Sequence, residues 1–204
     1  GKVEETAYAP MLRSLALDGY EVYLVRMPMH LAIFGINKAD KIIKENPSID
    51  NWTMMGHSLG GAMAASYAAK HVDVIDNLVL LAAYSTKDLS DSNIKVLQVY
   101  GSKDQVINRD NLEKNAKNLP KDALVYEIEG GNHAYYAYYG EQKNDGEATI
   151  SQEEQQQQQQ QNKDEMSKEN AEQLLKAVMQ DEKDVQEKVK KQLQIQGKKL
   201  EKDW

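Results

Sequence analysis

Three residue types that together perform nucleophilic catalysis occur in this sequence in a suggestive order. Ser58 lies in the pentapeptide Gly-His-Ser-Leu-Gly at positions 56–60, and Asp104 and His133 follow it along the chain. A serine hydroxyl is a weak nucleophile until a histidine removes its proton, and a carboxylate keeps that histidine in the correct tautomer. A G-x-S-x-G motif followed by an acid and then a histidine is one known arrangement of such a triad. The pattern therefore predicts a nucleophilic serine site.

The residues around Ser58 predict the local structure that this motif requires. The apolar run 51–55 predicts a short buried strand, and the small residues of 61–70 predict a helix. A strand that turns sharply into a helix lifts the serine hydroxyl above the sheet edge and strains its backbone. We expect that only glycine is tolerated on both sides of the turn, at Gly56 and Gly60, because a side chain would be crowded there.

The acid and the histidine are each predicted to follow a strand. The runs 95–100 and 123–128 predict strands that end shortly before Asp104 and His133. Active sites of open α/β sheets gather beyond the carboxyl ends of the strands, so the three groups should meet there. Further strands are predicted at 21–26 and 77–82, and helices at 8–17, 37–45 and 108–119, of which the second should be capped by Asn37. Only about a dozen residues separate the strand that ends near 82 from the strand that starts at 95, which is close to the minimum for a parallel connection. Strands alternating with helices indicate an α/β fold with a mostly parallel sheet flanked by helices.

The other candidate groups have structural interpretations. We expect His57 to pack beside the turn, His71 to end a helix in solvent, and His30 to be structural or to line a pocket. Four further carboxylates precede the 95–100 strand and are interpreted as turn or cap residues: Asp73, Asp76, Asp88 and Asp91. Four tyrosines follow His133 and are interpreted as a packed aromatic flank: Tyr135, Tyr136, Tyr138 and Tyr139. Neither metal-ligand spacing nor a phosphate-binding glycine loop is present in the sequence, so no metal or cofactor is predicted.

Residues 1–151 resemble the α/β-hydrolase superfamily, and more narrowly a small, lidless bacterial group of esterase-like proteins. The stretches that carry the resemblance are 7–10, 25–28, 34–37, 56–63, 80–84, 100–104 and 131–134. The resemblance implies that Ser58 is the nucleophile, His133 the general base and Asp104 the carboxylate that orients it. The fold itself does not determine which bond is cleaved.

Two further parts of the site are predicted from the same region. Developing negative charge on a substrate oxygen needs fixed donors, and the backbone N–H of Leu59 should be one, with a second from the loop near Gly1. Leu31, Phe34 and Tyr135 are expected to form an apolar pocket for the acyl or alcohol group.

The start of the chain carries a specific expectation. The strand that precedes the 8–17 helix in the family is absent, and Gly1 would stand at its carboxyl end. In the family's strand order that strand lies inside the sheet, so we expect a full-length parent to contain it and residues 1–204 alone to be poorly stable. The alternative is that strand 21–26 pairs directly with strand 51–55.

The composition of the chain argues against several kinds of partner and chemistry. The chain has 204 residues, is 41% hydrophobic and carries a net charge of −7, which argues against nucleic acid or an anionic membrane as partner. It has no cysteine, which excludes disulfides and thiolate catalysis, and no stretch long and apolar enough to span a bilayer. A cytoplasmic location is favoured, although a signal or anchor upstream of Gly1 would be invisible in this sequence.

The character of the chain changes after residue 151. Residues 152–169 are predicted to be a glutamine-rich linker. Ser151, directly before it, and Glu154 are predicted to form a capping box that starts a helix. Residues 170–204 predict a charged helical tail whose 170–196 helix has a thin apolar stripe and is a candidate to bind a protein partner. Residues 162–204 resemble the carboxyl end of tetratricopeptide-repeat proteins from bacterial aerotolerance operons, so we interpret the chain as a fusion joined in the glutamine run. We therefore expect removal of 155–204 to leave the preceding domain largely unchanged.

These features favour a serine hydrolase that cleaves small carboxylic esters or related acyl bonds without a cofactor. Two alternatives stay open. One alternative is a catalytically incomplete fragment that binds a partner through its tail. The other is an acyltransferase that uses the same three residues.

Overall fold

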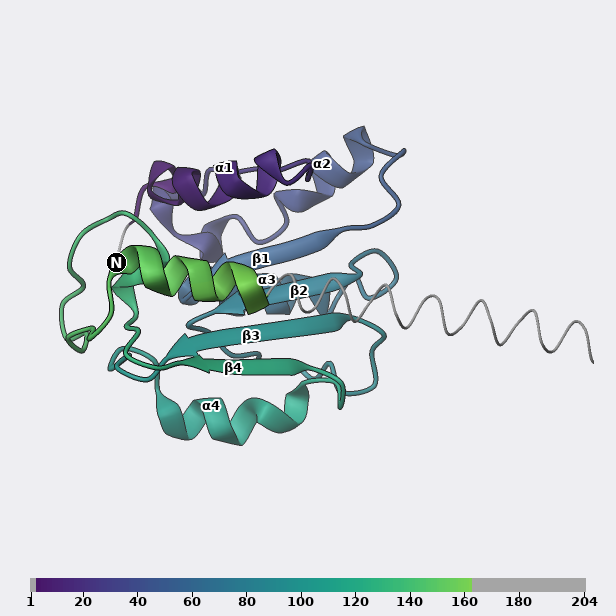
Figure 1. The fold of residues 1–204 in the computed structure, drawn as a ribbon. Helices are drawn as coiled ribbons and strands as arrows, with labels where there is room; N and C mark the ends of the chain where they lie inside the picture. The colour runs from purple at the N-terminus through teal and green to yellow at the C-terminus, as the bar shows by residue number, and fades with distance from the viewer. Residues whose placement is uncertain (1–2, 163–204) are drawn as a thin grey trace, which may run out of the picture. The chain divides into compact units, whose positions relative to one another are not determined.

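Residues 3–162 of the chain are described by a computed structural model, and they form one four-stranded parallel sheet with helices around it (Figure 1). The strands pair in sequence order, so neighbours along the chain are neighbours in the sheet, and their carboxyl ends share one edge. The strands are β1 (Thr53–His57), β2 (Asn77–Leu81), β3 (Lys95–Gly101) and β4 (Leu124–Ile128). The predicted α/β class with a parallel sheet flanked by helices is confirmed.

The middle of the sheet is fully buried. Every residue of β2 is buried, and its register places Val79 opposite both Met55 of β1 and Leu97 of β3. A continuous apolar run such as Leu-Val-Leu-Leu is what a strand covered on both faces requires. By contrast β1 is only partly buried, and it has no paired strand on its outer side among the described residues.

Helix α3 (Leu59–Ala68) packs on β1 and β2 and supplies much of the core. Its alanines and glycines allow the helix axis to approach the sheet closely, while Tyr67 fills the space beyond them. The remaining helices are α1 (Ala9–Leu17), α2 (Ala39–Glu45) and α4 (Arg109–Asn115), with short 3₁₀ turns η1 (Glu5–Tyr8), η2 (Pro28–His30), η3 (Ala32–Phe34), η4 (Ala116–Asn118) and η5 (Ala134–Tyr136). Among the described residues, none of the helices is long and apolar enough to cross a membrane.

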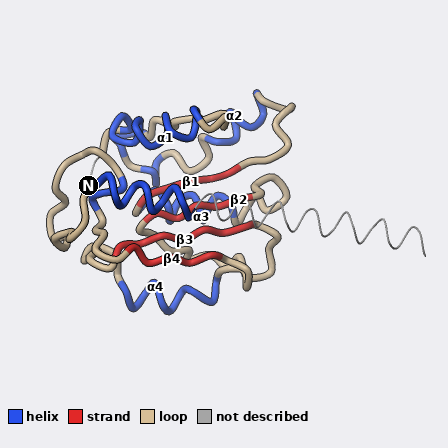
Figure 2. Tube along the Cα trace, in the orientation of Figure 1, coloured by secondary structure: helices blue, strands red, loops and turns tan. Residues whose placement is uncertain are grey.

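The predicted strand at 21–26 is wrong. These residues are an irregular connection between α1 and α2 (Figure 2), and no backbone hydrogen bond joins them to β1 in the described part of the chain. The physical reason is that the backbone of a strand needs a neighbouring strand to pair with. This segment is linked to its surroundings by side-chain contacts, such as Tyr23 with Trp52, and by the Arg26 carbonyl, which accepts from the Lys38 side chain. The alternative pairing of 21–26 directly with the 51–55 region is therefore also not formed.

The connection between β2 and β3 and the helix caps also differ from expectation in detail. Residues 82–94, between β2 and β3, contain no helix, yet the two strands remain parallel. Asn37 does not cap α2, whose first turn has no side-chain cap, whereas Asn108 caps α4 by accepting a hydrogen bond from Asn111 N–H at 2.8 Å.

The start of the glutamine-rich segment is an ordered helix. Residues 152–162 are helical, and the predicted capping box is present, because Ser151 N–H donates to the Glu154 carboxylate and Glu154 N–H donates to Ser151 Oγ. Gln155 is completely buried, so the start of the glutamine run packs on the preceding domain, while the effect of removing 155–204 stays a prediction. The predicted 170–196 helix and the rest of 163–204 lie outside the described residues.

Candidate active site

Ser58 occupies the sharp turn between β1 and α3. Its backbone lies at φ 53° and ψ −124°, a region that a residue with a side chain rarely adopts. Its N–H donates to the carbonyl of Leu81, at the end of β2, at 2.9 Å. This strained backbone is the geometry expected of a nucleophile elbow, the strand-to-helix turn that carries the serine of a G-x-S-x-G motif.

The glycines around the turn explain why the backbone can adopt it. A Cβ on Gly56 would lie 2.4 Å from the Gly60 carbonyl, and a Cβ on Gly61 would lie 2.5 Å from the Ala83 Cβ. A Cβ on Gly60 would meet nothing within 4 Å. The crowding predicted at Gly56 is therefore present, but that predicted at Gly60 falls on Gly61, because Gly61 lies against Ala83 and the Gly56 carbonyl while the Cβ position of Gly60 is open.

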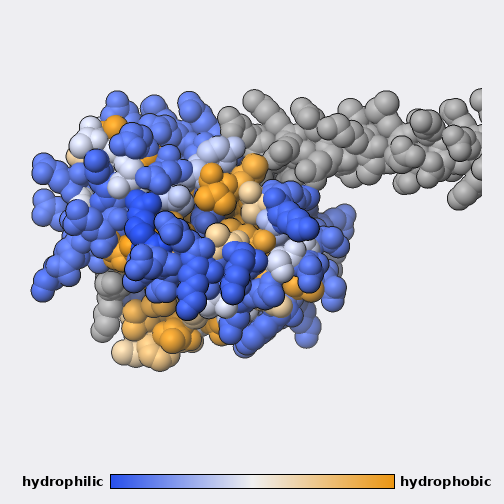
Figure 3. Space-filling model, turned by 90° about the horizontal axis from the view of Figure 1, so that it is seen from below, coloured by the Kyte–Doolittle hydropathy of each residue, from blue (hydrophilic) through white to orange (hydrophobic). Residues whose placement is uncertain are grey.

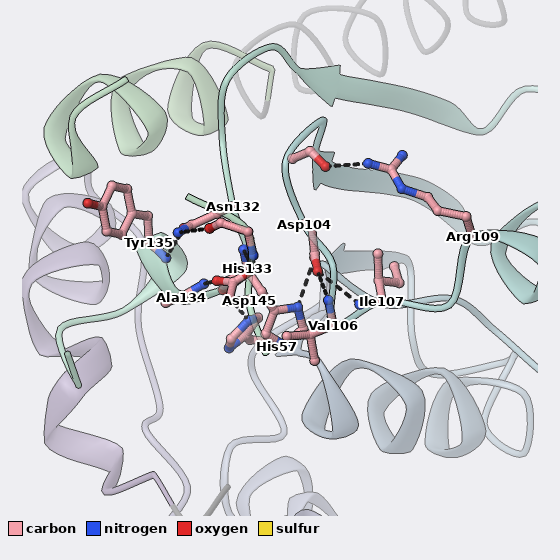
Figure 4. Close-up of polar contacts among 12 residues, drawn as sticks. His57, Asp104, Val106, Ile107, Arg109, Asn132, His133, Ala134, Tyr135 and Asp145 are labelled. Atoms are coloured by element: carbon pink, nitrogen blue, oxygen red, sulfur yellow. Dashed lines mark hydrogen bonds and ion pairs between the residues drawn. The ribbon is translucent and has the colours of Figure 1, made fainter. Parts of the chain in front are cut away.

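Asp104 and His133 form a buried hydrogen-bonded pair (Figure 4). The Nδ1 atom of His133 lies 2.8 Å from Oδ2 of Asp104, and the two side chains are 3% and 0% exposed. The other carboxylate oxygen accepts from the N–H groups of Val106 and Ile107, each at 2.9 Å. Because an ionised carboxylate only accepts, the proton of a neutral His133 lies on Nδ1, which leaves Nε2 with a lone pair to act as a base.

The loop that carries His133 is tied to the residue before the serine. The carbonyl of His133 accepts from Nε2 of His57 at 3.0 Å, and the two imidazole rings lie 4.7 Å apart. The structure thus brings the Asp104–His133 pair next to the elbow that holds Ser58.

His57 itself is not suited to be the base. Both ring nitrogens are engaged, one with the His133 carbonyl and the other with the Tyr8 hydroxyl at 2.9 Å. Burial, followed by the proximity of His133, lowers the pKa of His57 to about 3, so the ring is neutral at physiological pH. The rings of Tyr8, Tyr136 and Tyr139 lie around it, so two of the four tyrosines predicted as a packed flank pack here. Tyr138 of the same predicted flank is instead 44% exposed.

Of the two predicted donors for a substrate oxyanion, the structure describes only Leu59. Leu59 is the first residue of α3, where backbone N–H groups have no partner inside the helix. Such a group at a helix start is available to stabilise negative charge. Gly1, the second predicted contributor, lies outside the described residues.

The predicted pocket residues belong to separate parts of the chain. Leu31 adjoins η3, which contains the exposed Phe34 and packs against α3. Tyr135 lies in η5, and its ring points away from the Asp104–His133 pair (Figure 4). Its backbone N–H donates to Asn132 Oδ1, so Tyr135 contributes to the His133 loop through its main chain.

The remaining candidate groups have ordinary structural partners. Asp76 accepts from Trp52 N–H, and Asp88 accepts from both the N–H and the hydroxyl of Ser90. His71 stacks on Tyr67 at the end of α3. Within residues 3–162, no group of three or more metal-ligating side chains is close enough to hold an ion.

Two polar residues that support the site were not predicted from the sequence. Asp145 accepts from the N–H groups of His133 and Ala134, and Gln155 bonds to both backbone polar groups of Asn132. The Asp145-Gly146 dipeptide, twelve residues after the histidine, is a turn signal, but such a signal does not indicate contact with the His133 loop. Nothing distinguishes Gln155 from the other glutamines of its run, so no sequence signal singled it out.

Comparison with known proteins agrees with this fold. Residues 1–157 match the model of the alpha/beta hydrolase family. A candidate proline iminopeptidase of Mycoplasma genitalium is 37% identical over 62 residues, which is 28% of this chain and 20% of that protein. Similar solved structures include a monoacylglycerol lipase of Paleococcus ferrophilus (17% identity, TM-score 0.55, 66% of this chain and 83% of the other) and a pyrethroid hydrolase of Sphingobium faniae (14%, 0.51, 67% and 88%). At these identities the two structures establish the fold alone.

Proposed function

Because this chain belongs to the alpha/beta hydrolase family, we propose that it is a serine hydrolase that cleaves small carboxylic esters through Ser58, His133 and Asp104. The observation that carries the proposal is the buried 2.8 Å contact between Asp104 and His133 beside the strained turn at Ser58. The fold does not determine the substrate class, so the proposed ester preference rests on the exposed apolar side chains of Leu59 and Phe34 near the turn.

The chemistry proceeds in two acyl-transfer steps. His133 Nε2 takes the proton of Ser58 as the Oγ atom attacks the ester carbonyl carbon, and the Leu59 N–H donates to the resulting oxyanion. The imidazolium then gives its proton to the leaving alcohol, and Ser58 keeps the acyl group. A water molecule, deprotonated by His133, attacks the acyl-enzyme and releases the acid and the free serine. Asp104 stabilises the imidazolium throughout.

The acyl or alcohol group should be small and apolar. Phe34 and Leu59 are both large exposed apolar side chains, and η3, which contains Phe34, packs against the helix that begins at Leu59. Leu31 extends the same surface. Figure 3 shows apolar side chains gathered in separate patches on an otherwise hydrophilic face of the molecule. A short acyl chain placed on the apolar surface beside the elbow would be partly shielded from water.

Covalent labelling tests the mechanism most directly. A fluorophosphonate probe should modify Ser58, identified by peptide mass spectrometry, and the native chain should hydrolyse p-nitrophenyl butyrate. Ser58→Ala should lose the label and lower the hydrolysis rate roughly 10³-fold or more, whereas Ser14→Ala, on the exposed side of α1, should retain both. Full esterase activity in Ser58→Ala would refute the proposal.

Two additional assays separate the alternatives. Proline p-nitroanilide tests an amide substrate, since the Mycoplasma genitalium protein with local similarity is named as an iminopeptidase. Added acceptor alcohols test acyl transfer, because a transferase would form the new ester in preference to the free acid. If no substrate is turned over and no serine is labelled, the interpretation as an interaction protein acting through its tail gains support.

A further inference from the structure

The peptide segment that carries His133 is held almost entirely by side chains from distant parts of the chain. Five consecutive backbone polar groups, from Asn132 N–H to Ala134 N–H, are each hydrogen-bonded to a side chain. Asp145 accepts from the N–H groups of residues 133 and 134, and His57 donates to the carbonyl of 133. Gln155 makes the remaining two bonds, so the histidine's backbone is fixed from three directions.

Gln155 binds Asn132 as a strand neighbour would. Its Oε1 accepts from Asn132 N–H at 2.9 Å, and its Nε2 donates to the Asn132 carbonyl at 2.9 Å. The side chain is 0% exposed, so both bonds are shielded from water. A buried amide with both polar atoms satisfied is rigid, because loss of either bond leaves an unpaired polar group.

The preceding residue is shaped to admit this amide. A Cβ on Gly131 would lie 2.8 Å from Gln155 Oε1 and 3.1 Å from its Cδ atom. Any side chain at position 131 would therefore displace the amide from Asn132. The fit between the bare backbone at 131 and Gln155 indicates a specific contact.

One face of the helix at 152–162 repeats this mode of contact. Nε2 atoms on that face donate to the Ala137 carbonyl, the Tyr135 carbonyl and the Met11 Sδ atom. The glutamines involved, together with Gln155, are Gln152, Gln156 and Gln159, which share one helix face by their spacing of three and four residues. This helix face therefore packs on the loop after β4 and, through Gln159, on Met11 of α1.

We propose that Gln155 is a positioning residue for His133, which sets the orientation of the catalytic imidazole through the Asn132 peptide. Gln155 contacts neither the substrate nor the reacting atoms, so its effect is on the placement of the base. The inference rests on the proposed triad, because placement of His133 matters to activity only if His133 is the base. Misplacement of a catalytic group by a fraction of an ångström is expected to reduce turnover more than substrate binding.

Two substitutions at this position test the inference. Gln155→Met keeps the length of the side chain and removes both hydrogen bonds, so kcat for p-nitrophenyl butyrate should fall about tenfold while KM changes less than about twofold. Gln155→Glu introduces a titratable donor. The protonated acid reproduces both bonds, the carboxylate cannot donate to the Asn132 carbonyl, and burial raises the pKa of a carboxyl group. The ratio of its kcat to that of the native chain should therefore fall as the pH rises.

The matched controls come from the same run. Gln157 is exposed, so Gln157→Met should keep the native kcat, and the ratio for Gln157→Glu should not vary with pH. A second readout is independent of turnover: the low-field proton NMR signal of the His133 Nδ1–H, bonded to Asp104, should broaden or shift in Gln155→Met and stay in Gln157→Met.

The outcomes separate this inference from the proposed function. A native kcat and an unchanged low-field signal in a folded Gln155→Met would overturn the role of Gln155 while leaving the triad intact. Should Gln155→Met fail to fold, Gln155→Glu decides the matter, and a kcat ratio independent of pH would refute the inference. If the native chain shows no Ser58-dependent activity, the proposed function fails, and the NMR signal still tests whether Gln155 orients the ring.

Discussion

The amino-terminal and carboxyl-terminal regions of the described chain each contain a carboxylate–histidine pair, and the two pairs differ in every property that matters for catalysis. Asp104 and His133 lie 2.8 Å apart, and both side chains are fully buried. Glu5 and His30 lie 3.5 Å apart, with 24% and 31% of their side chains exposed, and Glu5 also faces Arg26. A buried pair with supporting hydrogen bonds has one geometry, whereas a partly hydrated pair is weakened by water and salt.

The same contrast holds for the backbone around each pair. The loop after β4 is anchored by Asp145, His57 and Gln155, whereas His30 lies between irregular segments and itself has a positive φ of 55°. Large apolar side chains are exposed mainly in the amino-terminal region, including Leu17, Leu24 and Met29. The difference teaches that a paired sheet and buried hydrogen bonds give a carboxylate and a histidine the single fixed geometry that a catalytic pair requires, and that the Glu5–His30 pair lacks this support.

The largest effect is expected when the two acids are exchanged for their amides. Asp104→Asn should lower esterase kcat by about 10³- to 10⁴-fold, because the amide donates to His133 Nδ1 and favours the wrong tautomer. Glu5→Gln should change kcat by less than about threefold, since an exposed ion pair contributes little. Steady-state kinetics on p-nitrophenyl butyrate measures both. Equal losses in the two variants would show that the regions are not functionally distinct.

A matched pair of leucines tests the same contrast in stability. Leu80 in β2 is 0% exposed and belongs to the main core, so Leu80→Ala should lower the free energy of unfolding by about 2–5 kcal/mol. Leu24, in the unpaired segment, is 43% exposed, and Leu24→Ala should change it by less than about 0.5 kcal/mol. Urea unfolding followed by circular dichroism provides both values. A loss above about 2 kcal/mol for Leu24→Ala would reveal a core around 21–26 that the described contacts do not account for.

The sequence predicts the carboxyl-terminal region, with its paired strands, better than the amino-terminal region. Strands β2, β3 and β4 were predicted from continuous or alternating apolar runs, and each has a strand partner with a matching pattern. The run 21–26 has similar strand propensity, but propensity forms a strand only when a neighbour supplies hydrogen bonds. Sequence patterns around a segment do not state whether that neighbour exists, so the error falls at the edge of the sheet beside β1.

The candidate site shows the same limit. The elbow at Ser58, and the loops with Asp104 and His133, follow from short motifs and strand ends, which are local signals. The supporting residues Asp145 and Gln155 act across separations of 12 and 23 residues, on the backbone of the His133 loop. Contacts between a side chain and a distant main chain leave no periodic pattern, so they emerge only when the fold is known.

The buried His57 predicts a specific loss of stability in acid. Its pKa in the folded chain is about 3, below the ordinary 6.5, so the unfolded chain binds a proton that the folded chain excludes. The contribution of neutral His57 to the free energy of unfolding is fully present above pH 6.5. It is lost as the pH falls toward 3, by at most about 1.4 kcal/mol per pH unit. His57→Gln should remove this part of the slope, whereas His30→Gln, in the amino-terminal region, should leave it in place. Denaturant unfolding at pH 4, 5, 6 and 7 measures it, and identical slopes for the native chain and His57→Gln would contradict the assignment.

The smallest expected effect compares a helix cap in each region. Asn108 accepts from Asn111 N–H at the start of α4, so Asn108→Ala leaves one N–H without its partner and should lower the free energy of unfolding by about 1 kcal/mol. Asn37, which the sequence predicted as the cap of α2, makes no such bond, because α2 begins at Ala39 without a side-chain cap. Asn37→Ala should therefore change stability by less than about 0.3 kcal/mol, a difference that thermal unfolding of the two variants side by side can resolve. Equal destabilisation would mean that Asn37 caps α2 in solution, and the amino-terminal helices would then be as well specified by their sequence as those that follow the sheet.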